Sequence, residues 1–307
     1  MDNIVTSMLF ATIVAGTPLI ITALGELITE KSGVLNLGAE GIMAVGAIAA
    51  FAVAHDTHST WAGVGAGLLA GAAMSLIFAV ITLTLMANQV ASGLALSIFG
   101  VGLSAFVGKP YESESMVAVP PIHIPLLADI PVIGPALFNQ QSLVYLSWVL
   151  FAGVTWFLYR SRAGLVLRAV GESPSSAHSI GYPVIRIRYL ATLFGGAMAG
   201  VGGAFLSVFY TPLWVEGMVA GRGWIALALV VFATWRPVRV AIGALLFGGV
   251  TALGLYLQTV GIHISAFALA SLPYLATVAV LVATSSNQLA LRRNAPASLG
   301  KPFFDGD

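Results

Sequence analysis

Long apolar stretches separated by short polar connections occupy most of the chain. An α-helix needs about 20 mostly apolar residues to cross about 30 Å of hydrocarbon, and nine stretches are candidates. They are residues 4–25, 34–54, 60–86, 89–107, 142–159, 188–209, 223–235, 238–258 and 264–284. The second contains Asn36 and Glu40, and the seventh is short. The pattern predicts an all-α, polytopic helical bundle with about nine (eight to ten) transmembrane segments.

The composition supports a membrane protein. Hydrophobic residues make up 58% of the chain and charged residues only 8%, against about 25% charged residues in an ordinary soluble domain. A water-soluble fold needs more charge than this to cover its surface, so that class is excluded. The formal net charge of +1 gives no basic field for nucleic acid. The chain has no cysteine, which excludes disulfides and thiol nucleophiles, and its five histidines lack metal-ligand spacing.

Lysine and arginine predict the orientation, because cytoplasmic loops carry an excess of both. If residues 160–188 are cytoplasmic, eleven of the thirteen Lys and Arg residues lie inside, and only Lys109 and Arg222 lie outside. The N-terminus is then outside the inner (plasma) membrane and the C-terminus is in the cytoplasm. We divide the chain into a transmembrane domain, residues 1–285, and a polar cytoplasmic tail, residues 286–307, which we expect to be mobile.

Small residues recur four positions apart in several stretches. Gly63, Gly67 and Gly71 form one row, and Gly196 and Gly200 belong to another. Such rows let helix backbones approach closely in lipid. Close packing within one subunit is the favoured interpretation, and a dimer face is the alternative.

The predicted cytoplasmic segment contains the signals of a short helix. Ser173 is a good N-cap, Pro174 suits the first helical position, Ser176 follows it, and Gly181 is a natural stop. A helix of about two turns is too short to be stable alone. Either a partner holds it, or the segment is a solvated loop whose arginines only set the topology; the pattern does not decide between the two.

Polar residues within the apolar stretches are candidates for a solute path. Asn36 and Glu40 share a helix face if their segment is helical, and a carboxylate near the membrane centre costs about 2.5–3.5 kcal/mol, so it should face a polar interior. Asn88 and Gln89 begin the fourth stretch. The alternative is that these groups only bind neighbouring helices and hold the fold, which we favour for Glu40 itself and for Asn88 and Gln89.

Three separated motifs resemble one family. They are Gly171-Glu172 with Ser176-Ala177 and Ile180-Gly181; the block Gly25 to Met43; and Gly221 to Ala228 with Trp235-Arg236-Pro237. Together these motifs resemble the ABC importer permeases of the branched-chain amino acid, ribose and nucleoside group, most closely the nucleoside and simple-sugar branch. The resemblance runs through residues 25–285, and His178 departs from the family pattern.

The resemblance implies roles for individual residues. The segment between the fifth and sixth spans would be a coupling helix that contacts the ATPase. Asn36, Glu40, Asn88 and Gln89 remain the candidates for the substrate pathway. The ATPase-coupling residues would be Gly171, Glu172, Ser173, Ser176, Ala177, Ile180 and Gly181. Glu216 and Arg222, in the outer loop after the sixth span, would dock a solute-binding protein by charge, although a simple solvated loop is equally consistent.

The resemblance also implies partners. The complex would contain two membrane subunits, often a related heteromer, an ABC ATPase, an external or periplasmic solute-binding protein, and membrane lipid. The chain has no Gly-x-x-x-x-Gly-Lys-Ser/Thr motif, so we expect ATP to be bound and hydrolysed by the partner ATPase, and this chain to be neither an enzyme nor a holder of cofactors or metals.

The solute and the transport class have alternatives. Nucleosides or simple sugars come first and branched-chain amino acids second. An ion-coupled secondary transporter would need ion ligands in paired broken helices, for which only Glu40 is a candidate. An intramembrane enzyme would need a catalytic dyad or metal site, and the sequence shows none.

Overall fold

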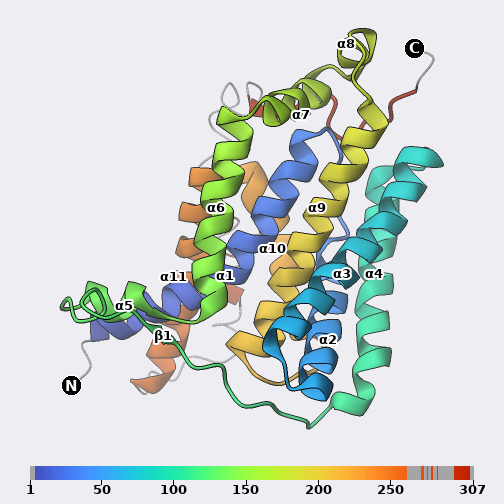
Figure 1. Ribbon diagram of the computed structural model, residues 1–307. Helices are drawn as coiled ribbons and strands as arrows, with labels where there is room; N and C mark the ends of the chain where they lie inside the picture. Colours follow the sequence, from blue (N-terminus) through green and yellow to red (C-terminus); the bar gives the residue numbers. More distant parts are fainter. Residues whose placement is uncertain are drawn as a thin grey trace.

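The protein is built almost entirely of helices (Figure 1). The computed structural model describes residues 4–260, 271, 272, 275, 278, 282 and 294–304. Within them, seven helices are long and apolar enough to cross a membrane. These are α1 (Ile4–Lys31), α2 (Ala39–Thr57), α3 (Thr60–Ala79) continued by η1 (Val80–Thr84), α4 (Gln89–Gly108) continued by η2 (Lys109–Tyr111), α6 (Ser142–Arg160), α9 (Val184–Ala204) continued by η3 (Phe205–Tyr210), and α11 (Pro237–Thr259). The predicted polytopic helical bundle is confirmed.

Two of the nine predicted stretches do not match a described helix of full membrane length. The seventh forms α10 (Arg222–Phe232), which has 11 residues. At about 1.5 Å per residue it covers only about half of the hydrocarbon thickness. The ninth, residues 264–284, lies almost wholly outside the described residues. The count of nine spans therefore stays a prediction.

The bundle has two distinct ends (Figure 1). The amphipathic helix α7 (Arg162–Glu172), the short helix α8 (Pro174–Ser179) and the C-terminus lie together at one end, called here the α8 end. The N-terminus, α5 (Ile133–Phe138) and a two-stranded antiparallel ribbon lie at the opposite α5 end. The ribbon pairs β1 (Ile122–His123) with β2 (Asn139–Gln140).

Helices α1 and α9 form the centre of the bundle. α1 packs against α6, α9, α10 and α11, and α9 packs against α1, α2 and α3. Glycines allow the closest contact: a Cβ added at Gly200 would overlap the carbonyl oxygen of Gly67, and one at Gly196 would overlap the side chain of Ser75. The small-residue rows of α3 and α9 thus meet each other, which confirms close packing within one subunit.

We expect Gly200→Leu to destabilise the bundle by about 3 kcal/mol, since overpacking a tight contact typically costs about 1–3 kcal/mol and backbone atoms on α3 cannot move aside. The matched control is Gly65→Leu, because a Cβ at Gly65 on α3 meets no atom within 4 Å. Thermal unfolding in detergent measures the difference. Equal stability of the two variants would contradict the packing described.

Helices α2 and α10 both begin inside the bundle. The chain leaves α1 at Lys31 and runs without helical structure through residues 32–38 before α2 begins. After α9, Trp214 packs near the α5 end against Gly108, and residues 215–221 then return into the bundle, where α10 begins beside Glu40. We call residues 32–40 together with residues 217–223 the broken-helix junction.

Candidate functional site

Glu40 joins the beginnings of two helices. It is the second residue of α2, and its carboxylate accepts hydrogen bonds from the backbone N–H of Gly221 (2.7 Å to Oε1) and of Gly223 (2.7 Å to Oε2) at the start of α10. Helix N-termini carry partial positive charge and unpaired N–H groups, which favour an anion there. A Cβ at Gly223 would overlap the backbone of Glu40, so glycine is what allows this approach. Glu40 therefore tethers α2 to α10.

Two amide side chains hold the non-helical part of the junction. Asn36 Oδ1 accepts a hydrogen bond from the N–H of Gly38 (2.9 Å), and Gln89 Oε1 accepts one from the N–H of Leu35 (2.8 Å). Both side chains are buried, and their amide nitrogens have no hydrogen-bond partner among the described residues. The structure thus brings Asn36, Glu40 and Gln89 to one place, with two buried donors still to be satisfied.

Asn88 has a different place. It is the exposed N-cap of α4, and its Oδ1 accepts a hydrogen bond from the N–H of Ala91 at 3.0 Å. A capping side chain of this kind typically contributes about 1 kcal/mol to helix stability.

We expect Asn88→Ser to leave uptake and solute preference unchanged, because serine caps a helix about as well as asparagine. Asn88→Ala should lower the free energy of unfolding by about 1 kcal/mol. Uptake competition between solutes and thermal unfolding are the two measurements. A changed order of solute preference in Asn88→Ser would instead assign the amide to the pathway.

Glu216 and Arg222, both predicted to dock a binding protein, lie in different surroundings. Glu216 is exposed on the loop after α9. Arg222 is the first residue of α10; its Nη1 donates to the carbonyls of Met218 and Val219, and its guanidinium lies 5.8 Å from the ring centre of Tyr210. Arg222 is therefore part of the broken-helix junction, next to the glycines that bind Glu40.

The far end of α10 is also fixed to α1. Trp235, just beyond α10, is buried, and its Nε1 donates to the buried Glu30 of α1 (2.6 Å). Sequence reasoning did not single out Glu30. The available signal was an acidic residue placed just before Lys31 at the end of a long apolar stretch, within the same motif block as Glu40.

The short helix predicted after residue 172 is present as α8. Ser173 is its N-cap, accepting from the N–H of Ser176 (3.4 Å), and Pro174 is its first residue. Gly181 follows it with φ +92°, a left-handed conformation that suits glycine. Ala177 faces inward and is buried, whereas Ile180 is 72% exposed. Glu172, which ends α7, and Ser176 of α8 are also exposed, so α8 and the residues beside it present an outward surface to solvent.

Gly171 fixes α7 to the end of α1. A Cβ at Gly171 would overlap the carbonyl oxygen of Lys31. The carbonyl of Gly171 in turn accepts hydrogen bonds from the N–H (3.1 Å) and hydroxyl (2.6 Å) of Ser298 in the C-terminal tail. α7, α1 and the tail therefore meet at this glycine.

The described part of the tail, residues 294–304, is packed, contrary to the expectation of a mobile tail. Arg188 of α9, 1% exposed, donates to the carbonyl of Ser32, the hydroxyl of Ser298 and the carbonyl of Lys301. Phe303 is buried in a small cluster with Val170, Ala177 and Val184, which belong to α7, α8 and α9. Single apolar residues in a polar tail are a weak sequence signal, which explains why the packing was missed.

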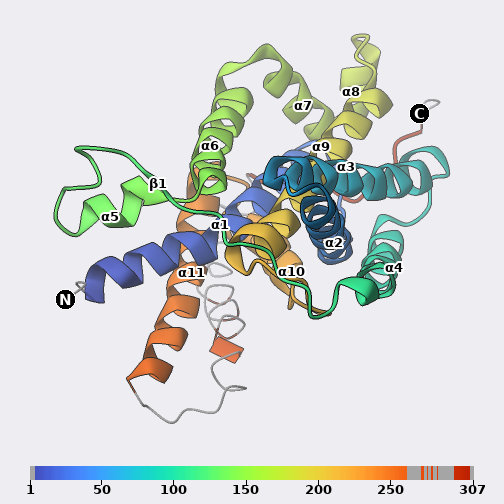
Figure 2. The ribbon, with the colours of Figure 1, turned by 60° about the horizontal axis from the view of Figure 1, so that its bottom comes forward.

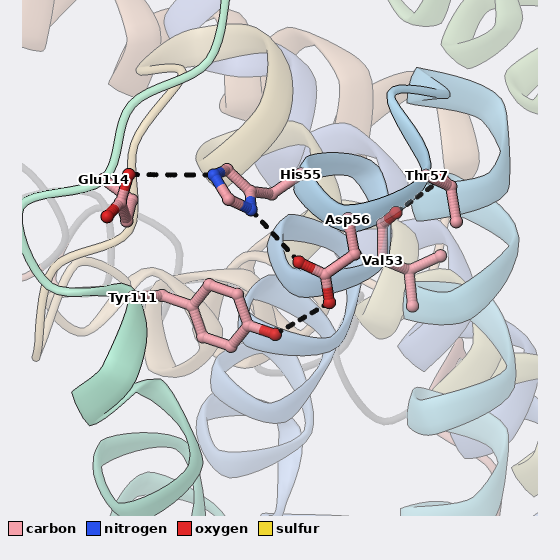
Figure 3. Close-up of polar contacts among 6 residues, drawn as sticks. All are labelled: Val53, His55, Asp56, Thr57, Tyr111 and Glu114. Atoms are coloured by element: carbon pink, nitrogen blue, oxygen red, sulfur yellow. Dashed lines mark hydrogen bonds and ion pairs between the residues drawn. The ribbon is translucent and has the colours of Figure 1, made fainter.

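At the α5 end, polar contacts fasten the long loop after α4 to the end of α2 (Figure 3). Tyr111 donates to Asp56 (3.0 Å), His55 contacts Asp56 (3.1 Å), and Nε2 of His55 lies 3.7 Å from Glu114. These groups are at least partly exposed. No group of three or more metal-binding side chains with suitable geometry occurs in the described part of the chain.

The family comparison agrees with this architecture. The family model described as "Branched-chain amino acid transport system / permease component" matches residues 8–284. The chain belongs to this family. The resemblance seen in the three sequence motifs is thereby confirmed.

Individual relatives are similar over most of their length. A protein of Haloferax volcanii named "Putative glucose ABC transporter permease protein" is 41% identical over 92% of this chain and 94% of its own. A nucleoside ABC transporter permease of Lactococcus lactis is 33% identical, covering 88% and 89%. A guanosine ABC transporter permease of Bacillus subtilis is 31% identical, covering 96% of both chains. This protein is therefore a multi-pass permease subunit of an ABC transporter, and the ATPase is a separate subunit.

Two of these organisms have a second, more distant relative with the same solute in its name. These are a glucose permease of Haloferax volcanii (24% identical) and a guanosine permease of Bacillus subtilis (27% identical), each matching 76% of this chain. No solved structure matches the chain significantly.

Proposed function

We propose that this chain is one of two different membrane subunits of an importer for a nucleoside or a simple sugar. The relatives that match nearly the whole chain carry glucose, nucleoside or guanosine in their names. The paired permeases in two organisms support a related but different second subunit. A solute-binding protein would deliver the solute at the α5 end, with exposed Glu216 as a docking residue.

We further propose that α8 is the coupling helix and that the α8 end is cytoplasmic. The single observation that carries this proposal is the outer surface of the capped helix α8 and its flanks: Glu172 before it, Ser176 in it and Ile180 after it are exposed, while Ala177 is buried on its inner side. A helix of six residues is stable only with tertiary support, and here that support leaves one side open for another protein. The orientation puts the N-terminus outside and the C-terminus inside.

A continuous series of contacts would carry motion of α8 to the centre of the membrane. α8 continues from α7, whose Gly171 lies against the end of α1 at Lys31. The next residues along the chain form the non-helical part of the junction, which leads to Glu40 and through it to α10. If ATP binding moves the two ATPase subunits together, α8 moves with them. The broken helices then shift as rigid pieces and open the pathway to alternate sides.

Buried amide nitrogens of Asn36 and Gln89 suit a polar solute at the junction, because each is a hydrogen-bond donor without a described acceptor. Arg222 and Tyr210 add a cation and an aromatic ring nearby. Sugar hydroxyls and nucleoside bases can use such donors and ring faces. Glu40 itself has both oxygens occupied by α10, so its role is to position the junction.

The proposal is tested by purifying this chain with its ATPase, the second permease and the binding protein in lipid vesicles. ATP hydrolysis should rise when the binding protein carries a nucleoside or a simple sugar, and stay at its basal rate with leucine. Failure to copurify with an ATPase would overturn the coupling proposal, and stimulation by leucine alone would overturn the solute class.

A further inference from the structure

An apolar groove of about 820 Å³ is lined by residues of α6, α7 and α9, together with Ile28 of α1. Figure 2 shows α7 running from the end of α6 toward α8. Every residue that lines the groove is apolar; Val149, Gly153 and Phe157 come from α6, Leu167 from α7, and Leu190 and Phe194 from α9. Val149 is 65% exposed and Leu190 is 59% exposed. The volume falls in the range of about 300–1,000 Å³ typical of ligand pockets.

Three arginines lie within three residues of groove-lining residues, on α6, α7 and α9. Arg160 is the last residue of α6, Arg162 the first of α7 and Arg186 the third of α9. All three are exposed, and the ion pairs of the described residues involve none of them. α6 and α9 contain no Asp or Glu, and the single acid of α7, Glu172, lies at its far end. The groove therefore has exposed arginines, without acidic neighbours on α6 or α9, close in sequence to its lining.

We propose that an anionic membrane lipid binds here, with an acyl chain in the groove and its phosphate against these arginines. The apolar lining suits a hydrocarbon chain. The groove also lies at the depth of the lipid acyl chains, because α6 and α9 are membrane-spanning helices. The charge matches because basic clusters at the membrane surface attract anionic headgroups. An arginine guanidinium can donate two parallel hydrogen bonds to a phosphate, whereas a lysine ammonium acts as a point charge. Arginine is therefore the better residue beside a phosphate.

Bound lipid would support the element that carries α8. α7 has its apolar side on the groove through Ala163, Val166 and Leu167, and it continues through Ser173 into α8. Hydrocarbon in the groove would pack against the apolar side of α7 and support α7 above the bundle. The lipid is therefore a structural ligand of the coupling region, separate from the solute pathway at the junction.

A bulky side chain in the groove tests the proposal. A Cβ at Gly153 meets no atom within 4 Å, so Gly153→Phe can fill the groove without disturbing the fold. Gly102→Phe, on an exposed face of α4 and equally free of contacts, is the matched control. The assembled importer, in nanodiscs of phosphatidylcholine with phosphatidylglycerol, is released into a native mass spectrometer, and retained lipids are counted.

One tightly held lipid per copy of this chain should remain in the wild type and in Gly102→Phe and be absent in Gly153→Phe. The double variant Arg162→Gln with Arg186→Gln should keep a lipid but lose the preference for phosphatidylglycerol, by about fivefold for each arginine. Equal lipid counts in the two phenylalanine variants would overturn the proposal. So would loss of the second permease from Gly153→Phe alone, which would make the groove a subunit interface.

Discussion

Uptake by the Glu40→Gln variant should fall at least about tenfold while the protein still inserts and assembles. The carboxylate accepts two backbone hydrogen bonds from α10, and hydrogen bonds to a charged group contribute about 1.5–3 kcal/mol each. Glutamine offers one acceptor and turns its NH₂ group toward the other N–H, which leaves a buried donor unpaired. A loss of about 3 kcal/mol is expected, and 1.4 kcal/mol is already about a factor of ten in an equilibrium.

The measurement is solute uptake in vesicles together with thermal unfolding of the purified complex. Glu112→Gln is the matched control, because it makes the same chemical change at an exposed position that has no role in the junction or in docking. Glu40→Gln should unfold at a lower temperature and transport every solute more slowly, with the order of solute preference unchanged. Normal stability with an altered solute preference would show that Glu40 contacts the solute.

Gly171→Ala should separate ATP hydrolysis from uptake. The new methyl group would overlap the carbonyl oxygen of Lys31, and backbone atoms on both sides leave no flexible side chain to move away. α7 must lift from α1, which displaces α8 from the path that leads to the broken-helix junction. We expect uptake to fall about tenfold or more, since strain of this kind costs about 1–3 kcal/mol.

Hydrolysis and uptake are measured on the same vesicles, so that their ratio reports the coupling. Gly102→Ala serves as control, because its Cβ has open space around it. In Gly171→Ala, hydrolysis should continue while its stimulation by the loaded binding protein disappears. Full uptake at the normal ratio of ATP to solute would contradict the role given to Gly171.

Hydropathy predicted the long helices well, because a membrane span needs a long apolar segment whatever its neighbours are. The local signals of α8 were equally reliable: Ser173, Pro174 and Gly181 act through their own backbone geometry. Arg222 shows where prediction from the sequence ends. The polar segment before the short seventh stretch was interpreted as an outer loop. Residues 215–221 instead return into the bundle, which only the contact of Gly221 with Glu40 reveals.

The residues of the candidate site could be predicted from the sequence, but their contacts could not. Asn36, Glu40 and Gln89 stood out because polar groups in apolar stretches are rare and need partners. Their partners could not be read from the sequence, since these are backbone N–H groups that every residue carries. The burial of Arg188 under the tail was also hidden, because three of its contacts come from segments more than 100 positions away.

A single introduced cysteine tests directly whether the ATPase holds α8 on the cytoplasmic side, because the chain has no cysteine of its own. Ser176→Cys on exposed α8 is compared with Ser59→Cys, the exposed cap of α3 at the α5 end. A cross-linker attached at position 176, but not at position 59, should capture the ATPase subunit, and membrane-impermeant reagent added to intact cells should label only position 59. Labelling of position 176 from outside the cell would contradict both the orientation and the coupling role.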